Sequence, residues 1–78
     1  IEDFNKAIEL DPEYAAAYNN RGNSYSDLGQ YQRAIEDYDK AIQLDPDDAY
    51  AYNSRGYSYR NLGQDRGVGR YIAHPDPA

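Results

Sequence analysis

The stretch that decides the fold is residues 18–46, which read YNNRGNSYSDLGQYQRAIEDYDKAIQLDP. In its first half, one set of positions recurs at steps of three or four residues: Tyr18, Arg21, Gly22, Tyr25 and Leu28. This is the spacing of one face of a helix. Gly29 is expected to end that helix, because glycine readily adopts the left-handed conformation of a helix cap.

The second half of the stretch carries another helical face, formed by Ala34, Ile35, Tyr38, Ala41 and Ile42. Pro46 marks the next break, since proline cannot continue a helix and pushes Asp45 out of helical geometry. Short connections make neighbouring helices antiparallel. Isolated helices of up to ~12–15 residues are marginal in water, so packing between the two helices must stabilise them.

The chain also repeats itself with a period of about 34 residues. Residues 1–12 align with 35–46, and residues 15–30 align with 49–64. About 20 of the 34 aligned pairs are identical, and the match stops after Gln64. The sequence therefore predicts an all-α protein in which one helical pair is repeated.

This pattern resembles a known family. The positions Tyr18, Arg21, Gly22 and Tyr25, followed by Ala34, Tyr38, Ala41 and Pro46, are similar to the tetratricopeptide repeat signature. The resemblance implies antiparallel helix-turn-helix repeats stacked in a right-handed superhelix, an α-solenoid. It also implies that Gly22, Ala34 and Ala41 lie where the two helices of a repeat cross closely. Tyr18 replaces a common Trp, and Arg21 and Arg55 replace a usual apolar residue.

The family's repeat unit, placed on this chain, begins near Ala15. Residues 15–48 then form one full repeat, residues 1–12 the second helix of a preceding repeat, and residues 49–63 the first helix of a following one. The repeat region is expected to span residues 1–64. Residues 65–78 contain glycines and prolines that disfavour a helix: Gly67, Gly69, Pro75 and Pro77. We expect an irregular or disordered tail there, either native or introduced by cloning.

Composition excludes several classes of function. The chain has 14 acidic and 8 basic residues and a net charge of −6. Nucleic-acid binding usually requires a basic stripe, and here the cations are scattered among carboxylates. No apolar run approaches the ~18–20 residues of a membrane span, and there is no cysteine for a disulfide framework. We expect a soluble chain of unassigned compartment, with the cytoplasm as the working assumption.

The sequence carries no complete catalytic or metal-binding pattern. The single histidine, His74, cannot build a hydrolytic triad alone. The acidic turn Asp45-Pro46-Asp47-Asp48 lacks the glycine and distal glutamate of a calcium loop. Residues 66–69 lack the frame of a phosphate-binding loop. We therefore expect no enzymatic activity, no metal and no cofactor.

The resemblance suggests instead a concave surface lined by the first helices of successive repeats, which binds extended peptides. Its residues in this chain are Asn19, Asn23, Ser26, Asp27, Tyr50, Asn53, Tyr57, Arg60 and Asn61, with Ala16 beside them. Tyr50, Asn53, Tyr57 and Arg60 also share one helical stripe by spacing. Asparagine amides suit peptide binding because they donate and accept hydrogen bonds. The alternative is that these are simply polar residues on a wet face. The family's carboxylate clamp lacks its cations here.

A buried core is expected at Phe4, Ile8, Tyr18, Gly22, Tyr25, Leu28, Ile35, Tyr38, Ala41, Ile42, Tyr52, Gly56 and Tyr59. A guanidinium among such residues needs a partner, because an unpaired buried charge is costly. Asp3 and Asp37 recur with the period of the arginines. We expect Arg21 to pair with Asp3 or Asp37, and Arg55 with Asp37. The alternative is that both side chains extend into water.

The function favoured by the sequence is a scaffold that binds a partner protein or peptide of unknown identity. A second reading is a structural self-assembly element, in which residues 49–63 of one molecule dock on residues 1–12 of the next in a head-to-tail superhelical stack. A third is an appendage that positions a neighbouring catalytic domain. The two repeats are alike enough that an engineered consensus sequence is also an open alternative.

Overall fold

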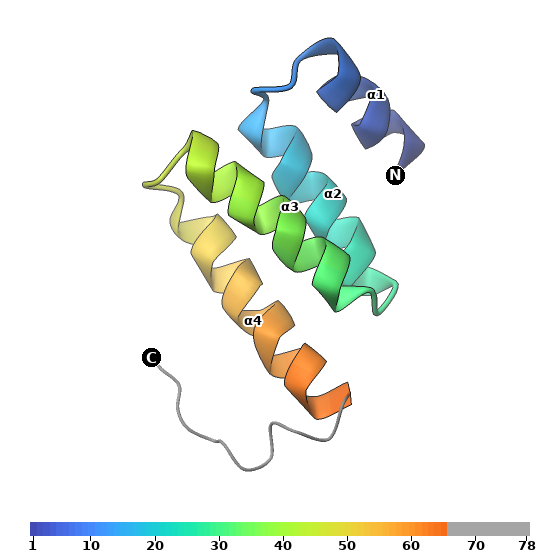
Figure 1. The fold of residues 1–78 in the computed structure, drawn as a ribbon, viewed down its shortest axis with the longest axis vertical. Coiled ribbons are helices and arrows are strands. Elements are labelled where there is room, and N and C mark those ends of the chain that lie inside the picture. The colour runs from blue at the N-terminus through green and yellow to red at the C-terminus, as the bar shows by residue number, and fades with distance from the viewer. Residues whose placement is uncertain (66–78) are drawn as a thin grey trace.

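The computed structural model describes residues 1–65, and all further structural statements concern these residues. They form four helices: α1 (Glu2–Leu10), α2 (Ala15–Asp27), α3 (Tyr31–Leu44) and α4 (Ala49–Asp65) (Figure 1). No strand occurs among them. The all-α prediction is confirmed, whereas the superhelix of a longer array stays a prediction at this length. The expected tail, apart from Asp65, lies outside the described residues.

Gly29 forms the turn between α2 and α3 in the way the sequence predicts. Its φ is +78°, a left-handed conformation that glycine adopts without strain. The Gly29 N–H donates to the Ser26 carbonyl at 2.9 Å, and the Gln30 N–H donates to the Tyr25 carbonyl at 2.8 Å. Together these bonds form a Schellman motif, which satisfies the last carbonyls of α2.

The corresponding Gly63 does not end α4, which continues to Asp65 and not only to residue 63. A glycine inside a helix costs only about 1 kcal/mol, so it permits a helix end without forcing one.

The Asp-Pro turns after α1 and α3 share one geometry. The C-cap residues Asp11 and Asp45 have φ values of −143° and −142°, and both side chains accept a hydrogen bond from a backbone N–H two residues later. These Asx turns provide a local reason for aspartate at both positions. The 34-residue repeat in sequence is thus a repeat in backbone geometry as well.

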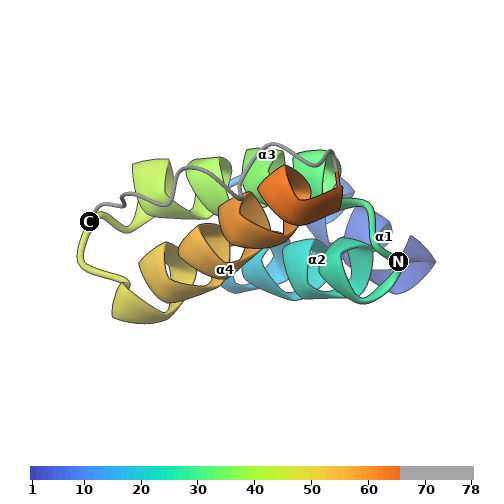
Figure 2. The same cartoon turned by 90° about the horizontal axis from the view of Figure 1, so that it is seen from below.

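The helices pack in two layers. Figure 2 shows α3 on one side, with α2 and α4 on the other. Helix α3 packs against both α2 and α4, and α2 also touches α4. The buried apolar residues come from these three helices: Ala17, Tyr18, Ala34, Ile35, Tyr38, Ala41 and Ala51. Ile8 of α1 joins the core from its edge.

Helices α2 and α3 approach each other closely at Gly22. A Cβ placed on Gly22 would lie only 2.8 Å from Cε1 of Tyr38, whose side chain is 1% exposed. The predicted role of Gly22 at the helix crossing is therefore confirmed, and Ala34 and Ala41 are fully buried in the same interface.

Four predicted core positions are exposed, which corrects that part of the prediction. Leu28, the C-cap residue that follows α2, is 61% exposed. Tyr52, Gly56 and Tyr59 of α4 are exposed because no described helix packs on their side. Their counterparts one period earlier lie under α3. Phe4, Ile8, Tyr25 and Ile42 are half-buried.

Candidate functional site

Arg21 is the centre of a polar cluster between the helices. Its Nε and Nη2 donate to the two carboxylate oxygens of Asp37 at 2.9 and 2.7 Å, and its Nη1 donates to Asn5 Oδ1 at 2.8 Å. The Asp37 hydrogen bond raises the pKa of the Arg21 guanidinium. The predicted pair with Asp37 is confirmed. Asp3, the other predicted partner, lies on the surface.

Aromatic rings complete the environment of Arg21. Its guanidinium carbon lies 5.8 Å from the centre of the Tyr18 ring and 5.9 Å from that of Tyr25. Both distances are in the range of cation–π attraction. Arg21 stands where the family usually has an apolar residue, but its charge is paired with Asp37 and lies beside two aromatic rings.

Arg55 pairs with Asp39 and not with the predicted Asp37; its Nη1 lies 2.7 Å from Asp39 Oδ1. The reason is the helix register. Arg21 reaches back by 16 residues to Asn5, and Arg55 reaches back by the same number to Asp39. Asp39 is the counterpart of Asn5 one period later, whereas Asp37 is already held by Arg21. Arg55 also lies 5.5 Å from the Tyr52 ring centre.

The inner surface of the protein is the side of α2 and α4 that carries the predicted peptide-binding residues. Asn19 and Asn23 among them are held by hydrogen bonds within the chain, and Tyr50 accepts one of these bonds while staying exposed. Asn19 is only 7% exposed, and its amide donates to Asp48 Oδ2 at 2.7 Å. Asn23 accepts a hydrogen bond from the Tyr38 hydroxyl and donates one to the Tyr50 hydroxyl, both at 2.6 Å. These asparagines connect α2 to its neighbours.

Asp48 links the start of α4 to α2. Its Oδ1 accepts from the backbone N–H groups of Tyr50 at 3.1 Å and Ala51 at 3.3 Å, which is N-cap geometry. Its Oδ2 holds Asn19. The acidic turn that resembled part of a calcium loop therefore has a structural role at this aspartate.

Tyr38 is the buried end of the hydrogen-bond chain Tyr38–Asn23–Tyr50. Burial raises the pKa of its hydroxyl to about 12, and the neighbouring Tyr50 adds to the shift. The hydroxyl therefore stays protonated at neutral pH and can donate to Asn23. Through this chain, a core residue of α3 fixes the position of an exposed ring on α4.

The remaining predicted residues are accessible. Tyr50 is 54% and Tyr57 59% exposed, and Asn53, Arg60 and Asp27 are exposed as well. Ser26 and Asn61 are half-buried. Sequence spacing correctly placed Tyr50, Asn53, Tyr57 and Arg60 in one stripe of α4, but it could not show that Asn19 and Asn23 are used internally.

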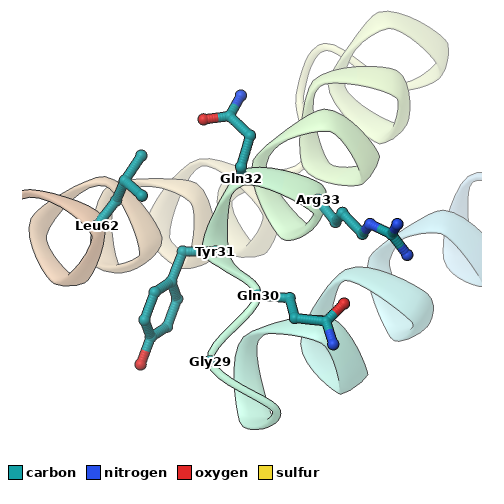
Figure 3. Close-up of a pocket in the computed structure, with 6 residues that line it drawn as sticks. All are labelled: Gly29, Gln30, Tyr31, Gln32, Arg33 and Leu62. Carbon is teal, nitrogen blue, oxygen red and sulfur yellow. The ribbon is translucent and has the colours of Figure 1, made fainter. Parts of the chain in front are cut away.

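Other features of residues 1–65 offer little chemistry. An open hollow of about 480 Å³ lies beside the α2–α3 turn. Figure 3 shows the residues that line it: Gly29, Gln30, Tyr31, Gln32, Arg33 and Leu62. Its side chains diverge rather than point to a common centre (Figure 3). Within the same residues, no group of three or more His, Cys, Asp or Glu side chains is arranged to hold a metal. None of the four helices is long and apolar enough to cross a bilayer.

Comparison with known proteins agrees with this geometry. Two sequence models of the tetratricopeptide repeat match the chain, one over residues 15–48 and one over residues 37–66. The first range coincides with α2, α3 and the turn that follows them. A search among curated proteins found no match. The matched residues, the helical pairs and the close crossing at Gly22 together show that this chain belongs to the tetratricopeptide repeat family.

Proposed function

We propose that the chain binds an extended peptide segment of a partner protein on its inner surface. Tetratricopeptide repeat domains generally mediate protein–protein interactions. The observation that carries the proposal is the exposed stripe of α4, where Tyr50 and Tyr57 are more than half exposed and Asn53 and Arg60 lie between and beyond them. Exposed aromatic rings beside an amide and a guanidinium are typical of binding surfaces.

Each type of side chain in the stripe suits a part of a peptide. The tyrosine rings provide apolar area with a polar edge and few rotatable bonds. The Asn53 amide can donate to a peptide carbonyl and accept from a peptide N–H. Arg60 can bind a carboxylate through two parallel hydrogen bonds. An extended peptide with an acidic residue near Arg60 meets all three requirements.

The hydrogen bond from Asn23 to Tyr50 supports the proposal because it restricts the Tyr50 side chain in the free protein. Because Asn23 is itself held by Tyr38, the Tyr50 ring is positioned before any ligand arrives. Pre-organisation of this kind lowers the entropy lost on binding.

A displayed library of random peptides, selected on the 78-residue chain, tests this proposal. The selected peptides should bind at least about tenfold more weakly to the double variant Asn53→Ala/Tyr57→Ala, because two central contacts are lost. Glu36→Ala is the control, since Glu36 is exposed on α3 and away from the stripe. Equal binding to the double variant and the wild type would exclude the stripe of α4 as the binding site.

The exposed opposite side of α4 favours a second function, self-assembly. Tyr52 and Tyr59 are 44% and 53% exposed there, whereas their counterparts on α2 are buried at Tyr18 and half-buried at Tyr25. We propose that α4 of one molecule docks on α1 of the next in a head-to-tail stack. Light scattering over a range of concentrations tests this: the mean mass should rise with concentration, and a constant monomer mass would contradict it.

A further inference from the structure

The side of α4 that faces away from the inner surface carries a defined set of residues, called here the docking stripe: Tyr52, Arg55, Gly56 and Tyr59. Each member has a counterpart on α2 one period earlier: Tyr18, Arg21, Gly22 and Tyr25. The two sets are identical in residue type but differ in burial. On α2, Tyr18 and Gly22 are buried and the other two residues half-buried, whereas on α4 only Arg55 is half-buried and the other three residues are exposed. The contacts on α2 therefore show which partner the docking stripe accepts.

Three residues of α3 contact this set on α2. Asp37 forms the bidentate ion pair with Arg21. The next residue, Tyr38, lays its ring over Gly22, where an added Cβ would be 2.8 Å away. Ala41 is 0% exposed and packs in one cluster with Tyr18. The required pattern is an acid, then an aromatic ring, then a small residue three positions on.

Helix α1 has this pattern in Asp3, Phe4 and Ala7. Six of the eight residues in 1–8 are identical to those in 35–42, so α1 is nearly a copy of the part of α3 that makes these contacts. Asp3 is exposed, and α1 contains no buried residue. Ile8 packs against the core cluster, whereas Phe4 and Ala7 are half-buried and keep part of their surface accessible.

The continuation of the same chain does not carry the pattern in its sequence. One period after Asp37, Tyr38 and Ala41 stand Tyr71, Ile72 and Pro75, so the acid is absent and a proline replaces the small residue. These three positions lie outside the described residues, and the comparison concerns residue type only.

We infer that the docking stripe binds α1 of a second copy, with Asp3 paired to Arg55 and the Phe4 ring over Gly56. This inference rests on the proposed self-assembly and specifies its register. Arg55 keeps Asp39 and gains Asp3, just as Arg21 holds Asn5 and Asp37 together. Gly56 is open to receive the ring, because no atom of the described residues lies within 4 Å of a Cβ built on it. The contact is heterologous and propagates from one copy to the next.

A charge exchange tests the predicted pair. Asp3→Arg and Arg55→Asp each place like charges opposite one another, so each variant alone should associate at least about tenfold more weakly than the wild type. In an equimolar mixture every contact between the two different variants joins opposite charges, and association measured by light scattering should return to near the wild-type level. Restoration by mixing also shows that both variants are folded. Absence of restoration in folded variants, judged by circular dichroism, would overturn the pairing.

Gly56→Ala provides a second test that does not disturb the monomer. The added methyl has free space in the single chain but would collide with the ring of Phe4 from the second copy. Association should fall at least about tenfold, while Gln43→Ala, at an exposed position of α3, should leave it unchanged. If the wild type associates and Gly56→Ala associates equally well, this register is wrong and self-assembly by another contact stands. If the wild type stays monomeric, both are wrong.

Discussion

The two helical glycines Gly22 and Gly56 allow one packing contact to be measured against a matched reference. Both lie inside helices and occupy the same position of the repeat. Replacing either with alanine gains about 1 kcal/mol of helix propensity. At Gly22 the new methyl would lie 2.8 Å from Cε1 and 3.1 Å from Cδ1 and Cζ of Tyr38. At Gly56 it would meet no atom of the described residues within 4 Å.

The collision at Gly22 cannot be relieved cheaply. Tyr38 is 1% exposed, and its hydroxyl is fixed by the hydrogen bond to Asn23, so the ring has little room to move. Over-packing of this kind costs about 1–3 kcal/mol. Because the propensity gain is common to both variants, Gly22→Ala should be less stable than Gly56→Ala by this same ~1–3 kcal/mol. Gly56→Ala itself should be about as stable as the wild type or more so.

Urea unfolding followed by far-UV circular dichroism measures the difference. The protein should be dilute, so that association does not contribute to the apparent stability. Equal midpoints for the two alanine variants would refute the reasoning, since they would show that α2 and α3 do not approach closely at Gly22. A lower midpoint for Gly56→Ala would show that its side of α4 is covered within one chain.

Three further predictions concern polar groups. Asp37→Asn should lower the free energy of unfolding by about 1–3 kcal/mol, because Arg21 loses a buried charged partner. Asp39→Asn at a more exposed pair should cost less than about 1 kcal/mol; equal losses in urea unfolding would contradict this. Ser58→Ala should stabilise the protein by about 1 kcal/mol, since the Ser58 hydroxyl is buried without a hydrogen-bond partner among the described residues; a loss of stability would reveal a partner. The Tyr38 pKa of about 12 exceeds the value of 10.0 for an unperturbed tyrosine, so its contribution is complete below pH 10.0 and is lost as pH rises towards 12. Stability should fall by roughly 2–3 kcal/mol over that range, and Tyr38→Phe should show a shallower fall; equal slopes would place the titration elsewhere.

Much of the fold follows from local rules that a sequence displays directly. The glycine cap at Gly29 and the Asp-Pro turns depend only on residues next to one another in the chain. The crossing at Gly22 follows from the helical period and the repeat. The Arg21–Asp37 pair was predictable because a buried guanidinium needs an acid and the repeat offered only two positions.

The errors arose where two helices must be placed against each other. Pairing Arg55 with Asp37 required knowledge of the register between α3 and α4, and the structure places Asp39 opposite Arg55 instead. Asn19 and Asn23 have the spacing of surface residues, because a polar residue that bonds across two helices cannot be distinguished by spacing from one that faces water. Asp48 could have indicated the internal role of Asn19, because an N-cap aspartate uses one carboxylate oxygen for the cap and its other oxygen can accept a further hydrogen bond.

The repeat also shows that burial is not a property of a residue type in its local sequence. Tyr18 and Tyr52 lie in nearly the same local pattern, yet Tyr18 is 8% and Tyr52 44% exposed. Tyr18 packs in the core cluster with Ala41 of α3, whereas no helix among the described residues takes the place of α3 over Tyr52. The sequence of a repeat helix therefore carries two faces that can pack, and each face is buried only where a neighbouring helix covers it. On α2 both faces are used, by α3 and by α1 and α4. On α4 one face meets α3, and the docking stripe retains the aromatic, cationic and glycine positions of a helix interface without a described helix upon it. This retention of interface chemistry on an exposed face is the strongest physical reason to test α4 as the side on which the protein meets another helix.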